Sequence, residues 1–262
     1  MKRCDYHVHT AFCDGKNTSG EVANAAFRLG VDTLGFVAHS YTDFDTGYCI
    51  KRESIGAYKQ TIAELKKEYS GRMRILCGVE QDYLSAPQTD GFDYVIGSVH
   101  YFEKDGRIFS VDKTAKEQKA AADELFGGDF YALAELYYST VADVVNRTGA
   151  DIIGHFDLIS KFNKGGRLFD EGHPRYVAAW QCAADELLRT GKPFEVNTGA
   201  ISRGYTSRPY PSRDMLLYIL ARGGNVVLNS DSHSADTVCF QFDIWRTYLI
   251  SLGFKDERIV TL

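Results

Sequence analysis

Short apolar runs alternate with longer amphipathic segments along almost the whole chain. Such runs, rich in β-branched and aromatic residues and bounded by turn signals, are typical of buried strands. The first predicted strand leads into the stretch from Tyr6 to His9. Further strands are predicted at 33–37, 74–79, 94–99, 152–154, 194–196 and 226–228, with a short last one at 258–261.

Helical spacing of the apolar positions predicts helices between these strands. Ile55, Tyr58, Ile62 and Leu65 fall on one face of such a helix, and Thr18 with Glu21 has the spacing of a capping box. Asp105-Gly106 between two aromatic pairs predicts a β-hairpin. The predicted helices cover 18–29, 52–69, 113–125, 130–147, 174–189, a segment ending near 221, and 239–252.

This alternation predicts an α/β fold with a parallel sheet. Seven or eight strand–helix units in 262 residues favour a closed β/α barrel, and we expect one domain over residues 1–262. A doubly wound open sheet is the alternative, but the sequence has no Gly-x-Gly-x-x-Gly fingerprint to support it.

Composition narrows the class of protein. The net charge of −5 argues against nucleic acid as a main partner, since phosphate-backbone binding needs basic excess. No apolar stretch is long enough for a membrane helix, and the N-terminus lacks a signal-peptide core. The six cysteines form no C-x-x-C pair, so we expect reduced thiols and a cytoplasmic location. The sequence leaves the oligomeric state open.

Candidate metal ligands lie at the predicted strand ends. His7 and His9 would share one face of the first strand, and six of the seven histidines lie at or just after a strand end. The carboxyl ends of all strands meet on one face of a β/α barrel, where such folds place their chemistry. With nearby acids, the candidate ligands are His7, His9, Asp14, His39, Glu80, His100, His155, Asp231 and His233.

Nine ligands exceed the needs of one ion, so two or three divalent ions are expected. Three ions would leave a strongly positive site after the charges of Asp14, Glu80 and Asp231 are subtracted. Such a site binds anions and can stabilise both the attacking and the leaving oxygen of a phosphoryl transfer. The pattern therefore predicts phosphate-ester hydrolysis.

The nine residues together resemble the PHP superfamily of metal-dependent phosphoesterases over residues 5–233. Gly78-Val79-Glu80, Gly97-Ser98-Val99-His100 and Glu195-x-Asn197-Thr198 are most similar to stand-alone histidinol-phosphatases. This resemblance implies a distorted (β/α)7 TIM-like barrel with a trinuclear centre of zinc, manganese or iron. It also implies a phosphatase that cleaves L-histidinol phosphate to histidinol and phosphate in histidine biosynthesis.

The resemblance also implies a division of the ligands among the three ions, and Glu80 would bridge two of them. Some relatives have histidine where this chain has Asp14. The implied sets are His7, His9, Glu80 and Asp231 for the first ion, Glu80, His100 and His155 for the second, and Asp14, His39 and His233 for the third.

The resemblance further gives Asp231, Glu80 and His233 catalytic roles, with Asp231 or a metal-bound water assisting proton transfer to the leaving alkoxide. Candidate phosphate-binding cations are Arg203, Arg208 and Lys161, because guanidinium and ammonium groups bind phosphate. Histidinol carries an ammonium and an imidazole, for which the candidate partners are Asp43, Asp45, Tyr101 and Phe102.

Three other functions remain open at this stage. The chain could be a PHP phosphoesterase acting on nucleotides, short nucleic acids or a phosphoprotein. It could be an amidohydrolase, although those enzymes usually carry a metal-bridging lysine that has no counterpart at a predicted strand end. A non-enzymatic scaffold of the same fold would be expected to have lost ligands, and this chain has all nine.

Overall fold

The computed structural model describes residues 2–262. Seven parallel strands form one sheet in the order β1-β2-β3-β4-β7-β8-β9. A separate hairpin of β5 and β6 follows β4. The strands are β1 (Cys4–Val8), β2 (Thr33–Phe36), β3 (Arg74–Asp82), β4 (Tyr94–Ser98), β5 (Tyr101–Lys104), β6 (Arg107–Ser110), β7 (Ile152–Ile153), β8 (Phe194–Asn197) and β9 (Val226–Asn229).

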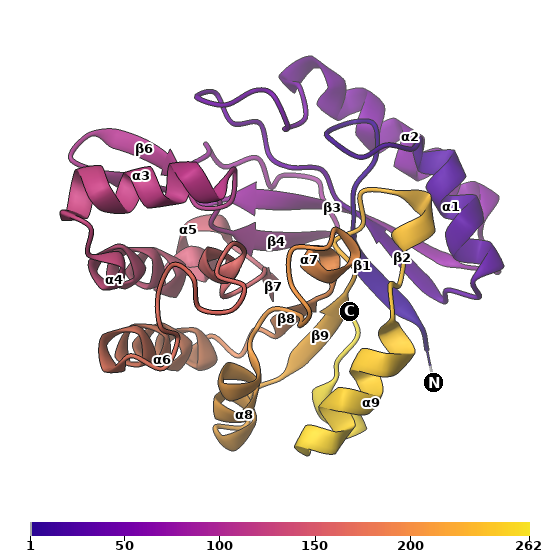
Figure 1. Ribbon diagram of the computed structural model, residues 1–262. Coiled ribbons are helices and arrows are strands. Elements are labelled where there is room, and N and C mark those ends of the chain that lie inside the picture. The colour runs from indigo at the N-terminus through magenta and orange to yellow at the C-terminus, as the bar shows by residue number, and fades with distance from the viewer. Residues whose placement is uncertain (1) are drawn as a thin grey trace.

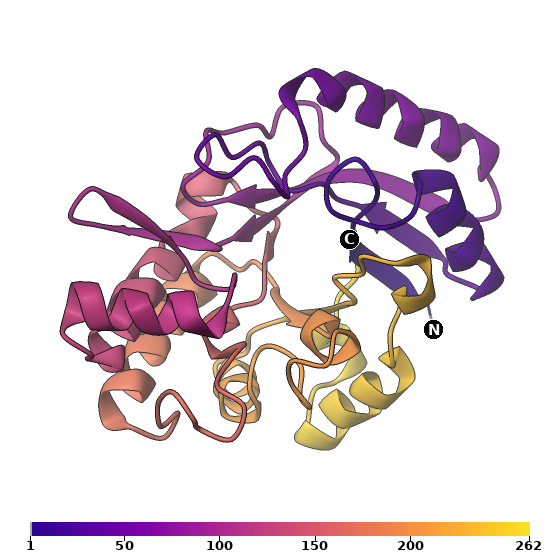
Figure 2. The same ribbon diagram turned by 45° about the horizontal axis from the view of Figure 1, so that its top comes forward.

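The sheet curls into a nearly closed barrel with helices on its outside (Figures 1 and 2). Between β1 and β9 the ladder is reduced to a single bridge, Val8 to Ser232, and the Tyr6 amide donates to the Asn229 side chain. The α-helices are α1 (Ser19–Arg28), α2 (Ile55–Glu68), α3 (Ala115–Phe126), α4 (Phe130–Ala142), α5 (Val144–Thr148), α6 (Pro174–Arg189), α7 (Gly199–Ser202), α8 (Arg213–Ala221) and α9 (Phe242–Leu252). Short 3-10 helices cover Arg52–Ser54, Leu158–Ser160, Ala235–Thr237 and Asp256–Arg258.

The predicted β/α barrel is therefore confirmed, with differences in detail. The helix predicted over 130–147 breaks at Asp143, whose φ of −97° and ψ of 0° leave helical geometry, so α4 and α5 are separate. The strand predicted at 258–261 is wrong, since this segment makes one bridge, Val226 to Ile259, after a 3-10 turn. That the chain is a single domain stays a prediction.

Tyr94, the first residue of β4, is buried at the amino-terminal end of the strands, inside the barrel. Its hydroxyl lies 2.6 Å from the Tyr6 carbonyl oxygen and 3.1 Å from that of Phe36, so it links three strands. A Cβ at Gly35 or Gly78 would overlap the Tyr94 side chain, which explains glycine at both positions. The aromatic plug closes one end of the barrel and leaves the carboxyl ends of the strands for polar residues.

The outer core lies between the sheet and the helices. The capping box predicted at Thr18 and Glu21 is present at the start of α1, and Tyr58, Ile62 and Leu65 of α2 are buried. None of the helices in residues 2–262 combines the length and the apolar character that a membrane span requires.

Candidate metal centre

All nine predicted ligands converge at the carboxyl end of the barrel. His7 lies in β1 and His9 just after it, while Glu80 lies in β3. The other residues follow β2, β4, β7 and β9 within a few positions, and Asp14 comes from the loop after β1. Parallel strands that run in the same direction bring their ends together, which explains the convergence of residues separated by more than 200 positions in sequence.

Glu80 is the central residue of this cluster. Its Oε2 lies 2.8 Å from His39 Nδ1, 3.2 Å from His7 Nε2 and 3.4 Å from His9 Nε2. Its Oε1 lies 2.9 Å from His155 Nε2 and 3.4 Å from His100 Nε2. The carboxylate is 1% exposed and thus faces five imidazoles from four strand ends, which is the geometry of a bridging ligand.

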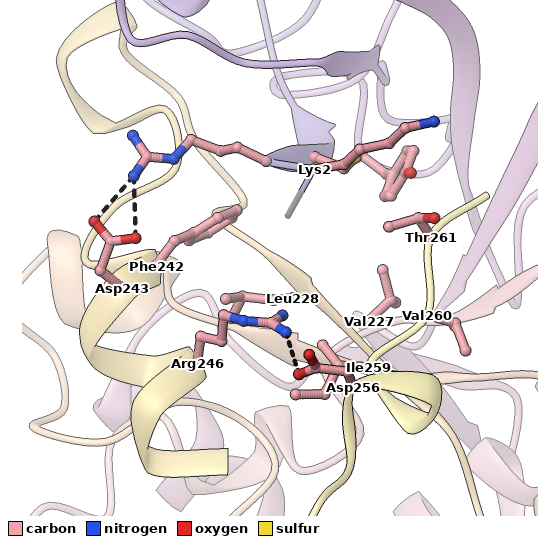
Figure 3. A pocket seen from close by; sticks show the side chains of 13 residues that line it. Lys2, Val227, Leu228, Phe242, Asp243, Arg246, Asp256, Ile259, Val260 and Thr261 are labelled. Carbon is pink, nitrogen blue, oxygen red and sulfur yellow. Dashed lines mark hydrogen bonds and ion pairs between the residues drawn. The ribbon is translucent and has the colours of Figure 1, made fainter. Parts of the chain in front are cut away.

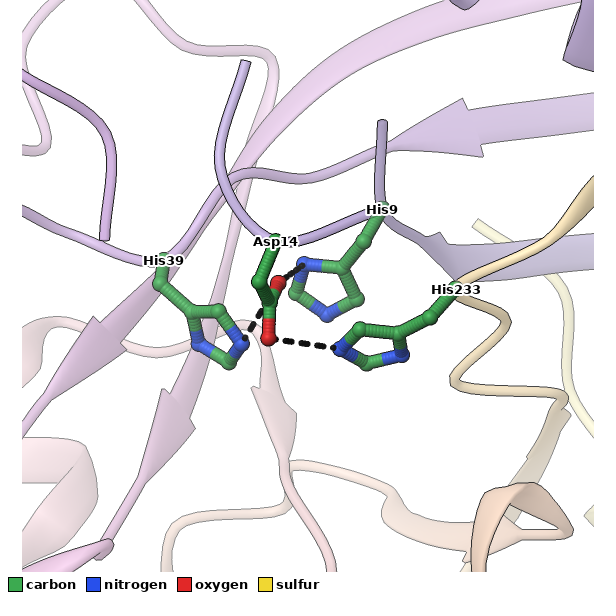
Figure 4. A group of neighbouring side chains, drawn as sticks. All are labelled: His9, Asp14, His39 and His233. Atoms are coloured by element: carbon green, nitrogen blue, oxygen red, sulfur yellow. Dashed lines mark ion pairs between the residues drawn. The ribbon is translucent and has the colours of Figure 1, made fainter. Parts of the chain in front are cut away.

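A second group forms the outer part of the cluster, where Asp14 faces three imidazoles (Figure 4). Asp14 Oδ2 lies 3.3 Å from His233 Nε2, and Oδ1 lies 3.6 Å from His39 Nε2 and 4.0 Å from His9 Nδ1. The His9 ring stacks between those of His39 and His233, with centroids 4.3 and 4.2 Å away. This group matches the ligand set expected for the third ion, with His9 in addition.

The donor set fits divalent metal ions. His7 Nε2 and His9 Nε2 lie 3.1 Å apart, and the buried Glu80 Oε2 has no hydrogen-bond partner among the described residues. Ring nitrogens and carboxylate oxygens that converge in this way are typical ligands of zinc, iron and manganese. Three groups of ligand atoms lie close enough together to hold an ion: His9, Asp14, His39 and His233; His7, His9 and Glu80; His39, Glu80 and His100.

The protonation of the cluster shows how strongly the carboxylates attract positive charge. Burial opposes a charge on His39, yet Glu80 and Asp14 raise its pKa to about 9. Burial, followed by electrostatic repulsion from the neighbouring His233 and His39 rings, lowers the pKa of His9 to about 3. Burial would raise the pKa of Glu80, but the charges on the imidazoles hold it well below its usual range. Bound cations would replace these protons, so metal binding releases protons.

A cavity of about 450 Å³ opens over the cluster and contains two of the three predicted phosphate-binding cations. Arg203 Nη2 lies 2.9 Å from Asp231 Oδ2, and its Nη1 lies 2.9 Å from His233 Nδ1. Lys161 Nζ donates to Asp112 Oδ2 at 2.9 Å. Both cations thus lie at the cavity wall with a carboxylate partner, and their role in phosphate binding stays a prediction.

Arg208, the third predicted phosphate-binding cation, lies elsewhere. It donates to Asp157 at 3.1 Å and to Glu171 at 2.6 Å, and it lines a separate small hollow beside Gly165. Two carboxylates already satisfy its guanidinium. This position supports a role in holding two loops together and does not support contact with the phosphate.

The sequence did not single out several residues in the cavity wall or behind it. Tyr48 lies edge-on to His39, with centroids 4.8 Å apart, and Asp112 holds Lys161. Asp82 accepts from the His100 backbone amide at 2.9 Å. Asp82 follows Glu80 by two positions on β3 and so shares its face, a signal that could have identified it.

A second hollow of about 390 Å³ lies at the opposite end of the barrel (Figure 3). Arg3 pairs with Asp243 and Arg246 with Asp256, so their charges are balanced within the chain. Phe242 and Ile259 supply part of an apolar floor. None of the groups with metal-binding geometry in residues 2–262 includes a residue of this hollow.

Proteins of known sequence are similar to this chain over most of its length. The family model of the PHP domain matches residues 5–199. A curated relative from Deinococcus radiodurans, named probable histidinol-phosphatase, is 31% identical over 253 residues, which cover 91% of this chain and 89% of that protein. The histidinol-phosphatase of Bacillus subtilis is 27% identical and covers 93% of this chain and 98% of its own length.

Two solved structures share the fold. HisK from Listeria monocytogenes has a TM-score of 0.80 at 19% identity, covering 93% of this chain and 100% of its own. HisK from Lactococcus lactis, solved with zinc, L-histidinol and phosphate, has a TM-score of 0.68 at 22% identity, covering 97% and 95%. The fold, the convergent ligands and the match of the family model to most of the sequence agree: the chain belongs to the PHP family.

Proposed function

We propose that the protein is a metal-dependent histidinol-phosphatase that hydrolyses L-histidinol phosphate to L-histidinol and phosphate. The observation that carries this proposal is the complete set of nine ligands around Glu80, in a cavity that also presents Arg203. Curated relatives that match over most of the chain bear the same name. A role in histidine biosynthesis and a cytoplasmic location follow as parts of the proposal.

The proposed cofactor is a set of three divalent ions drawn from zinc, manganese and iron. The ligand assignment is the one implied by the family, with Glu80 bridging the first and second ions. Asp231 Oδ1 lies 3.7 Å from His7 Nε2 and 3.6 Å from His9 Nε2, which supports its place beside them. His9 presents Nε2 to Glu80 and Nδ1 to Asp14, so it lies between the first and third ligand sets.

The ions, when bound, supply Lewis-acid stabilisation of phosphoryl oxygens and an activated water. The protein's own groups position and neutralise the substrate. Arg203 lies against Asp231 and His233 with about a third of its side chain exposed to the cavity. A guanidinium in this place can donate to a phosphate oxygen while one edge remains bound to Asp231.

Asp231 carries a negative charge at neutral pH. Burial would raise its pKa, but Arg203 and the surrounding imidazoles hold the pKa well below the usual range of an aspartate. The carboxylate can therefore accept a hydrogen bond from a water at the metal centre and orient it, whereas removing a proton from that water would need a stronger base. His233 lies 3.5 Å away from Asp231 through its Nδ1, close enough to share in proton transfer to the leaving alkoxide.

The cavity wall near Tyr48 supports a cationic, heteroaromatic leaving group. Tyr48 and Tyr101 extend outward from His39, with ring centroids 6.1 Å apart. Asp45 Oδ2 accepts from the Tyr101 hydroxyl at 3.0 Å and pairs with the exposed Lys113 at 3.3 Å. Aromatic faces and a carboxylate bind ammonium and imidazolium groups, and the ammonium of histidinol could replace that of Lys113.

Substrate screening separates this function from its alternatives. The metal-loaded protein should release phosphate from histidinol phosphate far faster than from nucleoside monophosphates or a dinucleotide diester. Glu80→Ala should lose both metal, measured by elemental analysis, and phosphatase activity. Preference for a nucleotide or a diester would instead support another PHP phosphoesterase, and full activity in metal-free Glu80→Ala would refute a metal-dependent mechanism. An amidohydrolase is disfavoured because the two lysines that line the cavity among the described residues, Lys113 and Lys161, pair with Asp45 and Asp112 and not with the candidate ligands.

A further inference from the structure

Glu195 lies directly beneath the candidate metal centre and is fully buried. It belongs to β8 and receives four hydrogen bonds. Oε1 accepts from His7 Nδ1 at 2.6 Å and from Asn229 Nδ2 at 2.9 Å. Oε2 accepts from the His155 backbone amide at 2.8 Å and from Asn197 Nδ2 at 3.0 Å. Both oxygens are thus occupied by protein donors, which leaves Glu195 no free position to bind a metal ion itself.

The contact with His7 fixes which ring nitrogen faces the metal cluster. The carboxylate at 2.6 Å holds a proton on Nδ1, so Nε2, 3.2 Å from Glu80 Oε2, is the nitrogen left to bind a metal ion. A carboxylate on the far nitrogen also makes an imidazole a stronger metal ligand. The equivalent nitrogen of His9, Nδ1, lies 3.4 Å from the Cys13 sulfur, a weak acceptor, and 4.0 Å from Asp14 Oδ1, which is beyond hydrogen-bond distance.

The contact with His155 connects the same carboxylate to a second ligand set. His155 follows β7, and its Nε2 reaches Glu80 Oε1 on the side opposite His7. Its Nδ1 has no hydrogen-bond partner among the described residues, so the backbone bond to Glu195 is what holds this residue from behind. One buried side chain therefore supports a ligand on each side of the bridging Glu80.

The burial of Glu195 is costly unless it has such a task. An ionised carboxylate removed from water needs charge partners or several hydrogen bonds. None of its four donors belongs to lysine or arginine, and His7 is the one titratable side chain among them. A glutamine would fill the same space but offers a single acceptor oxygen, so its NH2 group would face either His7 or the His155 backbone amide.

We propose that Glu195 is a positioning residue that sets the ring orientation of His7 and the backbone of His155, and thereby the metal affinity of two sites at once. It neither binds metal nor contacts the substrate. The proposal rests on the metal centre of the proposed function, but it does not depend on which phosphate ester is cleaved.

Two substitutions test the proposal. Glu195→Gln keeps the size but can accept from only one side, so either His7 or the His155 amide faces an NH2 group. Glu195→Asp keeps the charge but is one methylene shorter and cannot reach both partners. Loss of such supporting hydrogen bonds typically weakens metal binding by about 10- to 100-fold. We expect a loss of this size in both variants, measured by competition with a chelator and by elemental analysis.

Asp157→Asn provides a matched control. Asp157 is equally buried and follows β7, but its carboxylate is bound to Arg208 and the Ser212 amide and to no ligand side chain. This variant should lose stability while it keeps its metal affinity within about twofold, because its contacts are separate from those of Glu195. A further readout is the His7 tautomer in zinc-loaded protein, observed by two-bond 1H–15N NMR, which should change in Glu195→Gln only.

The outcomes decide the role of Glu195. Wild-type metal affinity in folded Glu195→Gln would overturn the proposal. Normal affinity in Glu195→Asp with a loss in Glu195→Gln would show that charge alone matters, which would also overturn a positioning role. Equal losses in Asp157→Asn would assign the effect to general stability. None of these measurements uses histidinol phosphate, so a different substrate would refute the proposed function and leave this result intact.

Discussion

Replacing Gly199, which is not itself a candidate ligand, with alanine should displace the ligand Asp231. Gly199 is the first residue of α7, and a Cβ added there would lie 2.8 Å from Asp231 Oδ2 and 2.9 Å from Asp231 Cβ. The Arg203 guanidinium would also be 2.9 Å away. Since comfortable contacts between such atoms need roughly 3.5 Å, one partner must move by about half an ångström.

Asp231 cannot move freely, because its surroundings hold it on several sides. Its φ of 47° is unusual for a residue other than glycine. Arg203 donates to the Asp231 carboxylate at 2.9 Å and to the Asp231 carbonyl oxygen at 2.9 Å. Asn197 Nδ2 also donates to the carboxylate, at 3.3 Å. A shift of Asp231 would therefore lengthen these bonds and move Oδ1 away from His7 and His9.

The expected size of the effect follows from two opposing contributions. Overpacking a buried site costs about 1–3 kcal/mol, whereas the lower entropy of the unfolded chain returns about 0.4–1 kcal/mol for Gly→Ala. The net free energy of unfolding should fall by about 1–2 kcal/mol. Because a misplacement of about 1 Å can cost 100-fold in rate, a shift of half that size should lower kcat/KM by about tenfold.

Urea unfolding and phosphate-release kinetics would measure both effects. The control is Gly20→Ala in α1, where an added Cβ meets no atom within 4 Å. This control should gain up to about 1 kcal/mol of stability and keep its activity. Gly199→Ala with wild-type stability and wild-type kcat/KM would show that Asp231 is not confined as the geometry indicates.

Three further predictions concern pH, substrate selection and loop anchoring. Metal affinity of the apoprotein should rise as pH increases toward 9, because the raised pKa of His39, about 9, means that a proton must leave before an ion binds; a flat chelator-competition profile from pH 6.5 to 9 would contradict this. Because the pKa of His39 is raised on folding, its protonation stabilises the folded apoprotein fully below pH 6.5. This contribution is lost as pH rises through 9, which urea titrations at fixed pH would detect. Asp45→Asn should raise KM for histidinol phosphate severalfold and leave inhibition by inorganic phosphate unchanged, since Asp45 contacts Tyr101 and Lys113 and belongs to none of the candidate ligand groups; equal changes in both constants would exclude a role in binding the organic group. Arg208→Met should lower the unfolding free energy by about 3–5 kcal/mol, the typical cost of removing one partner from the buried Asp157, and a folded variant that keeps KM would confirm that Arg208 does not bind substrate.

The sequence predicted the barrel and its ligand face because both depend on local rules. Strand ends could be recognised from apolar runs, and the parallel sheet brings those ends together whatever their separation in sequence. His39 and His233 could thus be placed side by side although they lie far apart in the sequence. The packing of the outer helices followed from the same periodicity, as in α2.

Residues whose role depends on a partner from a distant loop could not be predicted in this way. Arg203 and Arg208 lie five positions apart in the sequence, and both were candidate phosphate-binding residues. The fold places Asp231 beside Arg203, whereas Asp157 and Glu171 lie beside Arg208. Because of these different partners, Arg203 faces the cavity and Arg208 holds two loops together. Glu195 was visible as part of a motif, but its four donors come from four separate positions of the barrel.

The inward rows of the barrel explain why the metal ligands lie where they do. On a strand every second residue faces the same side, and these rows change from apolar to polar toward the carboxyl end: Leu76, Gly78 and Glu80 on β3; Tyr94, Ile96 and Ser98 on β4; Val227, Asn229 and Asp231 along and just beyond β9. The apolar members form one buried cluster with Tyr6 and Ile152. Two of the middle positions have other tasks: Gly78 leaves room for Tyr94, and Asn229 donates to Glu195. Charged ligands two residues nearer the amino-terminal ends of the strands would face Tyr94 and would be cut off from water and substrate. The change from apolar to polar residues along each strand therefore confines the metal centre to the open end of the barrel.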